Sequence, residues 1–164
     1  VPIARVAARL GAPVALVGST DATLRKAKSA LEREVRDLEV AFVQAPPMGF
    51  DPEGDAADAL LRAVAASGAR LCFLALGAPK QETLAARGRR IAPGVGFVSI
   101  GAGLDFIAGT QRRAPAWVRR LAAEWLWRAL ADPRRLAVRY LLCAAILPRE
   151  IVQALLLRLR ARQG

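Results

Sequence analysis

The chain contains no histidine among its 164 residues. This absence excludes a Ser-His-Asp triad, metal ligation by histidine and imidazole acid–base chemistry. Catalysis would therefore have to use carboxylates, arginines, amides or backbone donors. There are only two cysteines, Cys72 and Cys143, and both lie in apolar runs without a partner at metal-ligand spacing. We interpret them as buried free thiols of a protein from a reducing compartment.

Two common nucleotide-binding signatures are also missing. No G-x-G-x-x-G follows the first expected strand, and the chain has no G-x-x-x-x-G-K-[ST]. A dinucleotide-binding site and a P-loop are therefore unsupported, and we expect no cofactor. The longest charge-free stretch of the C-terminal region, residues 140–148, is far shorter than the roughly 18–20 apolar residues of a membrane span. This region is not expected to cross a bilayer.

The chain does have a large apolar fraction, 54%, with 24% charged residues, which is typical of one globular domain with a real core. Its net charge of +11 is unevenly distributed, because residues 112–164 hold twelve arginines against three carboxylates. The asymmetry predicts an anionic partner for this segment: phosphate, nucleic acid or lipid head groups. A solvated basic face is the alternative.

Short apolar runs alternate with helical patterns in the first two thirds of the chain. Strands are expected at residues 14–17, 40–43, 71–76 and 95–100, and helices at 3–10, 21–35, 52–67 and 79–90. Thr20 would cap the second helix, and Pro79 would be the first residue of the fourth. This order predicts an α/β fold, a Rossmann-like parallel sheet with helices on both faces.

From Pro115 onward the pattern becomes helical throughout. Helices are expected at 117–130, 133–147 and 149–162, with prolines at the breaks. We therefore divide the chain into an α/β domain, residues 1–111, and a basic C-terminal helical appendage, residues 112–164. In the appendage, Arg128, Arg135 and Arg139 are spaced to share a helix face, although Pro133 interrupts it. Arginines gathered in this way suit a diphosphate, which they bind with paired N–H donors.

The candidate binding residues of the α/β domain follow the expected strands, because ligands of open parallel sheets bind beyond the carboxyl ends of the strands. After the third strand, Gly77 permits close backbone approach, and Lys80 and Gln81 would place a cation and an amide beside a helix N-terminus. An ordinary turn is the alternative. After the fourth strand, Gly101 indicates a positive φ or a close approach to a ligand. Asp105 would either orient a sugar hydroxyl or cap the next helix.

Six short motifs occur in a fixed order over residues 77–140: GAPKQE, G-x-G-x-D-F-x-A-G, R-A-P-x-W, E-W-L-W-R, P-R-R and R-Y. Together they resemble the WecG/TagA/CpsF glycosyltransferases. The resemblance implies an inverting, metal-independent enzyme that moves an N-acetylmannosamine-type sugar or related hexose from a UDP-sugar donor to a polyprenyl-diphosphate-linked acceptor. It also implies a peripheral protein on the cytoplasmic face of the bacterial inner membrane, active in surface polysaccharide or wall polymer synthesis.

The resemblance also implies roles for the two parts of the chain. Residues 1–111 would bind the sugar nucleotide, with Gln81 in the donor pocket. Residues 112–164 would dock on the membrane and close over the donor, with Arg128, Arg135 and Arg139 on its diphosphate. The family's Thr-x-Asn strand end and Asp-Gly turn have no match here, and Val1 is not an initiator methionine. We therefore expect an incomplete or trimmed chain whose general base precedes Val1, and its catalytic residue is unknown.

Two other functions are compatible with the composition. A non-catalytic α/β module would bind anionic lipid or nucleotide through its basic tail. Nucleic-acid binding is supported by charge alone, and the tail interleaves arginine with leucine and tryptophan, as a membrane-surface helix does. We therefore expect a membrane surface rather than nucleic acid as the partner. Monomer and homo-oligomer both remain open.

Overall fold

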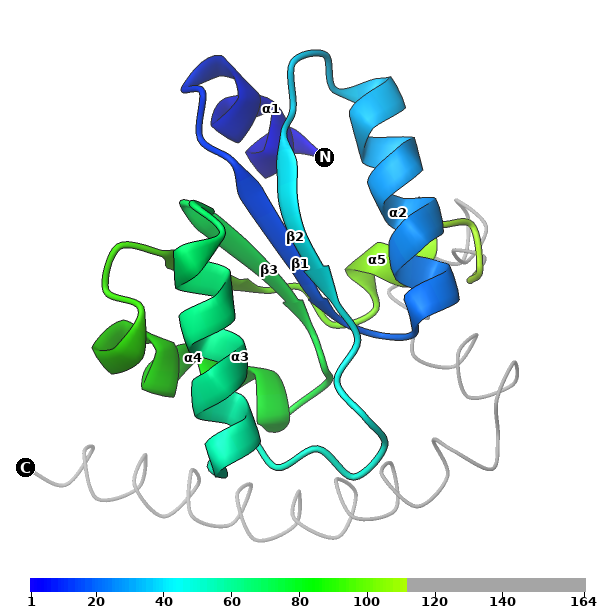
Figure 1. Ribbon diagram of the computed structural model, residues 1–164. Coiled ribbons are helices and arrows are strands. Elements are labelled where there is room, and N and C mark those ends of the chain that lie inside the picture. Colours follow the sequence, from blue (N-terminus) through cyan, green and yellow to red (C-terminus); the bar gives the residue numbers. More distant parts are fainter. Residues whose placement is uncertain (112–164) are drawn as a thin grey trace, which may run out of the picture. The chain divides into compact units, whose positions relative to one another are not determined.

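The computed structural model describes residues 1–111, which form an α/β fold with a four-stranded, all-parallel sheet flanked by helices (Figure 1). The expected appendage and Cys143 lie outside the described residues. In chain order the elements are α1 (Pro2–Arg9), β1 (Val14–Gly18), α2 (Asp21–Glu34), β2 (Val40–Gln44), α3 (Asp55–Ala66), β3 (Leu71–Ala75), α4 (Lys80–Ile91), β4 (Gly96–Ser99) and α5 (Gly103–Ile107). The predicted fold class and alternation are confirmed.

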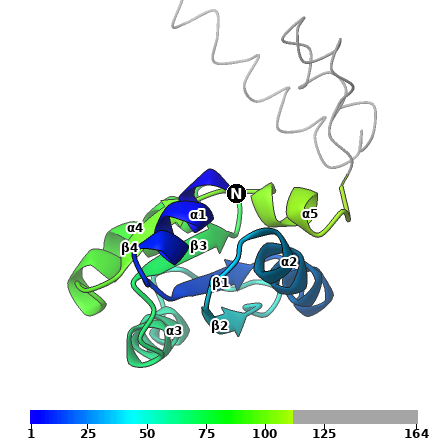
Figure 2. The same cartoon turned by 90° about the horizontal axis from the view of Figure 1, so that it is seen from above.

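The strands lie in the order β2-β1-β3-β4, so β1 and β3 are the two central strands. The chain leaves β1 through α2 on one face of the sheet and leaves β3 through α4 on the other face (Figure 2). Their carboxyl ends lie side by side, with Gly18 paired with Ala75 in the register. This is the topological switch point at which open α/β sheets bind ligands.

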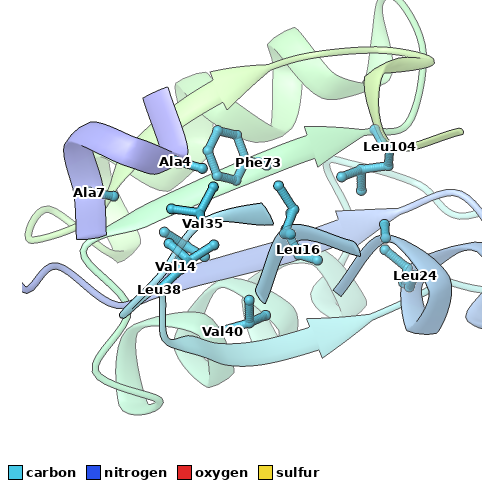
Figure 3. Packing of buried hydrophobic residues seen from close by; sticks show 13 residues of the cluster. Ala4, Ala7, Val14, Leu16, Leu24, Val35, Leu38, Val40, Phe73 and Leu104 are labelled. Carbon is cyan, nitrogen blue, oxygen red and sulfur yellow. The ribbon is translucent and has the colours of Figure 1, made fainter. Parts of the chain in front are cut away.

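Alternating side chains of the central strands supply two separate cores, as the period of two in a strand requires. Val14 and Leu16 point into a cluster with α1, α2 and α5 (Figure 3). Ala15 and Val17 point into the cluster beneath α3 and α4. All of β1 is buried, so the sequence of this strand is apolar without interruption.

Cys72 of β3 belongs to the core beneath α3 and α4 and is fully buried. The predicted burial of this thiol is therefore confirmed. Burial raises the pKa of the Cys72 thiol to about 12, because the thiolate would lose its hydration. At neutral pH Cys72 is a small apolar core residue rather than a nucleophile.

The helix starts follow local hydrogen bonds, and the predicted starts of the third and fourth helices were wrong, while α1 begins one residue before its predicted start. The Thr20 hydroxyl caps α2 by accepting from the backbone N–H of Thr23 at 3.3 Å, as predicted. The third helix begins at Asp55 rather than at residue 52, because Asp51 forms a turn by accepting from the N–H of Glu53. Pro79 precedes α4 as its N-cap, with its carbonyl accepting from Thr83, so the helix begins one residue later than predicted.

A substitution at Gly18 tests the close approach of the two central strands, β1 and β3. It has φ +115°, and a Cβ there would lie 2.5 Å from the backbone of Ala75. Gly18→Ala should lower the free energy of unfolding by about 3 kcal/mol, from backbone strain and overpacking together. Gly68→Ala is the matched control, since Gly68 also has positive φ but open space around it. It should lose only about 1 kcal/mol. Chemical denaturation measures both, and equal losses would contradict the close approach.

The ion pair between Asp58 of α3 and Arg87 of α4 predicts a pH effect. The hydrogen bond and charge of Arg87 lower the pKa of Asp58 in the folded state. This stabilisation is present above the ordinary carboxyl pKa and is lost as the pH falls toward the lower, folded-state value. Asp58→Asn should therefore flatten the acid limb of stability against pH, whereas Asp55→Asn, an unpaired carboxylate within residues 1–111, should not. Identical acid limbs for Asp58→Asn and the parent would show that the pair has no effect.

Candidate functional site

Three loops meet at the carboxyl edge of the sheet. They follow β1, β3 and β4, and they comprise residues 19–20, 76–79 and 100–102. Backbone hydrogen bonds join the first and third loops to β3: Ser19 N–H donates to the Ala75 carbonyl at 3.0 Å, and Ile100 N–H donates to the Leu74 carbonyl at 2.8 Å. The loops therefore extend the sheet's ladder by one step before the chain turns away. The side chains of these loops and of the first turns of α4 and α5 form the candidate site.

Ser19 connects the first loop to α5, a role that the sequence did not predict. Its hydroxyl donates to Oδ1 of Asp105 at 3.1 Å across 86 residues of chain. Ser19 also has φ +54°, an uncommon backbone conformation for a residue with a side chain. Strain held by surrounding contacts in this way is typical of ligand-binding sites. The only sequence signal for Ser19 is its position directly after the last residue of a buried strand.

Asp105 lies in the first turn of α5, which begins at Gly103, and it makes no cap bond. Of the two roles expected for Asp105, capping of this helix is therefore wrong, because the helix begins two residues before it. Oδ1 of Asp105 faces Ser19 and the more distant hydroxyl of Thr110. Within residues 1–111, Oδ2 accepts no hydrogen bond, so one carboxylate oxygen is left for a ligand.

Gln81 joins the first turn of α4 to the third loop. It is one of two buried polar side chains among residues 1–111, with 8% of its surface exposed. Its Oε1 accepts from the N–H of Gly101 at 3.0 Å, and its Nε2 donates to Glu82 at 2.8 Å. Gly101 has the positive φ that its sequence indicated. Because the amide nitrogen carries two protons, Gln81 keeps one donor beyond these two bonds.

Lys80 and Gly77 flank the start of α4. The ammonium of Lys80 donates to the carbonyl of Phe50 at 2.7 Å, which joins the loop after β2 to this edge of the sheet. Gly77 is exposed and has φ +78°, and a Cβ there would meet nothing within 4 Å. Within residues 1–111, the positive φ of the turn before α4 is the reason for a glycine at this position. The Gly77 carbonyl accepts from the N–H of Gln81. One N–H group at the N-terminus of α4 is therefore already bonded within the chain.

The described side chains bring a carboxylate, an amide and an ammonium to one edge of the sheet. They can accept from and donate to a polar ligand, and the α4 N-terminus adds a partial positive charge. Within residues 1–111 no three acidic or cysteine side chains gather in a way that would hold a metal ion. None of the helices described there is long and apolar enough to span a membrane. Arg128, Arg135 and Arg139 lie outside the described residues.

The sequence matches the model of the glycosyl transferase WecG/TagA/CpsF family over residues 2–163. The chain belongs to this family. The match covers the α/β domain and almost all of the C-terminal segment, which confirms the resemblance carried by the six motifs. Membership in the WecG/TagA/CpsF family supports glycosyl transfer in polysaccharide synthesis. Because open α/β sheets bind ligands at their switch point, the candidate ligand site of this chain lies between the carboxyl ends of β1 and β3.

Replacement of Ser19 separates its two structural roles. Ser19→Ala removes the hydrogen bond to Asp105 and keeps the unfavourable φ, so we expect a loss of about 1 kcal/mol in the free energy of unfolding. Ser19→Gly removes the same bond but relieves a backbone strain of similar size, so its stability should stay within about 0.5 kcal/mol of the parent. Urea denaturation measures both variants. Equal stability of the two variants would argue against strain at Ser19.

Proposed function

We propose that this chain binds the UDP-sugar donor of a hexosyl transfer to a polyprenyl-diphosphate-linked acceptor. The observation that carries the proposal is a pair of hydrogen bonds at the switch point: Ser19–Asp105 joins the loop after β1 to α5, and Gln81–Gly101 joins α4 to the loop after β4. Each bond fixes a polar side chain and leaves it further hydrogen-bonding capacity. A preorganised carboxylate oxygen and amide N–H suit a ligand that has both donors and acceptors, as a nucleotide sugar has.

The charge of the donor fits the rest of the site. In the proposal, Lys80 and the N-terminus of α4 lie near the diphosphate, since both favour anions. Arg128, Arg135 and Arg139 of the C-terminal segment complete its neutralisation with bidentate N–H donors. Such donors replace a metal ion in stabilising the departing diphosphate. The proposed transfer is therefore metal-independent, and the family resemblance adds inversion at the anomeric carbon to the proposal.

The acceptor determines where the reaction takes place. A polyprenyl-diphosphate-linked acceptor is held in a membrane, so we place the protein peripherally on the cytoplasmic face of the bacterial inner membrane. The C-terminal arginines and tryptophans are suited to that interface. Neither Asp51 nor Asp105 is assigned as the general base, because Asp51 holds the N–H of Glu53 and Asp105 holds the Ser19 hydroxyl. The product enters surface polysaccharide or wall polymer synthesis.

The diphosphate contact is tested by titrating UDP into the full-length protein in a calorimeter. Arg135→Ala and Arg139→Ala should each weaken binding by roughly 1.5–3 kcal/mol, the value of a lost charged hydrogen bond. Arg160→Ala removes the same charge from the same segment and serves as the control, with affinity expected to stay close to that of the parent. Unchanged affinity in the first two variants would remove the arginines from the donor site.

A further inference from the structure

A groove between α2 and α5 has an unusual charge distribution. It encloses about 530 Å³. Its lining contains three cations and no carboxylate; the residues are Arg25, Lys26, Ser29, Ala30, Arg33, Ile107, Ala108 and Gly109. Arg25, Lys26, Ser29 and Arg33 are exposed, whereas Ile107 and Ala108 are half-buried and pack against the core. The groove therefore has a basic wall and a partly apolar floor.

The ion pairs of α2 show that this basic wall is not a by-product of a generally basic helix. Lys28 pairs with Glu32, and Glu34 pairs with Arg5 of α1. Among residues 1–111, the cations of α2 that have no acidic partner are those that line the groove. By comparison, another groove of about 410 Å³, beside α1, contains both Glu34 and Asp37 among its arginines and is largely neutralised internally.

We propose that the α2–α5 groove docks on the head groups of anionic membrane lipids. Arg25 and Arg33 are eight residues apart, which separates them by roughly 12 Å along the helix. A single small phosphate needs donors that converge on one point, whereas a row of cations suits a surface with several head groups. The half-buried Ile107 and Ala108 supply the apolar contact that a membrane interface favours.

The position of α5 links this surface to the candidate site. Its first turn carries Asp105 to the carboxyl edge of the sheet, and its end, Ile107, lines the groove together with the two residues that follow. Docking through the groove would hold the candidate site next to the membrane surface. The proposal does not rest on the UDP-sugar assignment, because it uses only the charges and packing of α2 and α5.

Vesicle co-sedimentation of the full 164-residue chain tests the proposal. The test variant carries Arg25→Gln, Lys26→Gln and Arg33→Gln. The control carries Arg70→Gln, Arg89→Gln and Arg90→Gln, which removes the same charge from exposed positions away from the groove. Both variants keep the basic C-terminal segment, so its contribution cancels in the comparison. All six side chains are exposed, and circular dichroism confirms that both variants fold.

Each cation close to an anionic surface strengthens binding about fivefold. On vesicles of phosphatidylcholine with phosphatidylglycerol, the groove variant should therefore lose at least about tenfold in affinity, and the control variant less than about threefold. The difference should diminish at high salt and be absent on phosphatidylcholine alone. An equal loss in both variants would overturn the proposal, because binding would then follow net charge.

A second arm distinguishes a soluble ligand from a membrane. Inorganic pyrophosphate is titrated into the parent and the groove variant. A loss of pyrophosphate binding with unchanged vesicle binding would overturn membrane docking in favour of a soluble phosphate ligand. The groove variant should bind UDP as the parent does. Failure of UDP binding in every protein would count against the proposed donor site and leave the vesicle comparison intact.

Discussion

The close approach of β1 and β3 at their carboxyl ends is the constraint on which the candidate site depends. Gly18 permits it, because any side chain at this position would overlap the backbone of Ala75. The approach brings Ser19 within hydrogen-bonding distance of the Ala75 carbonyl and turns the chain into the left-handed conformation. From there the Ser19 hydroxyl donates to Asp105 of α5, the helix that packs against α2. The absence of a Cβ at Gly18 is thus a condition for the geometry of both the loop after β1 and its contact with α5.

The polar side chains at this edge combine structural and binding capacity. Asp105 and Gln81 each use part of their hydrogen-bonding capacity to fix a neighbouring loop. A side chain fixed in this way loses little further entropy when a ligand binds, which is the physical advantage of preorganisation. The buried amide of Gln81 also has a structural role. Its Oε1 accepts from the N–H of Gly101, which would otherwise bind a water molecule.

The sequence predicted what depends on neighbouring residues and missed what depends on distant ones. The apolar runs of β1 and β3, the Thr20 cap and the positive φ of Gly101 follow from local patterns, and the structure has all of them. The motif order over residues 77–140 was sufficient for the family. The Ser19–Asp105 bond joins residues 86 positions apart and depends on a strand order that no local pattern contains. α3 begins later than its apolar periodicity predicted, at Asp55, because the Asp51 side chain accepts from the N–H of Glu53 and holds a turn there.

Among the helices described in residues 1–111, α5 is the shortest and depends on its surroundings. A helix of five residues is too short to be stable alone, since nucleation is not repaid by so few hydrogen bonds. α5 is held by fully buried Leu104, by its packing against α2 and by the Ser19 hydroxyl. The position of Asp105 is therefore set by both the switch point and α2. The basic face of α2 lies along the same contact, so what binds that face and what binds Asp105 act on the same short helix.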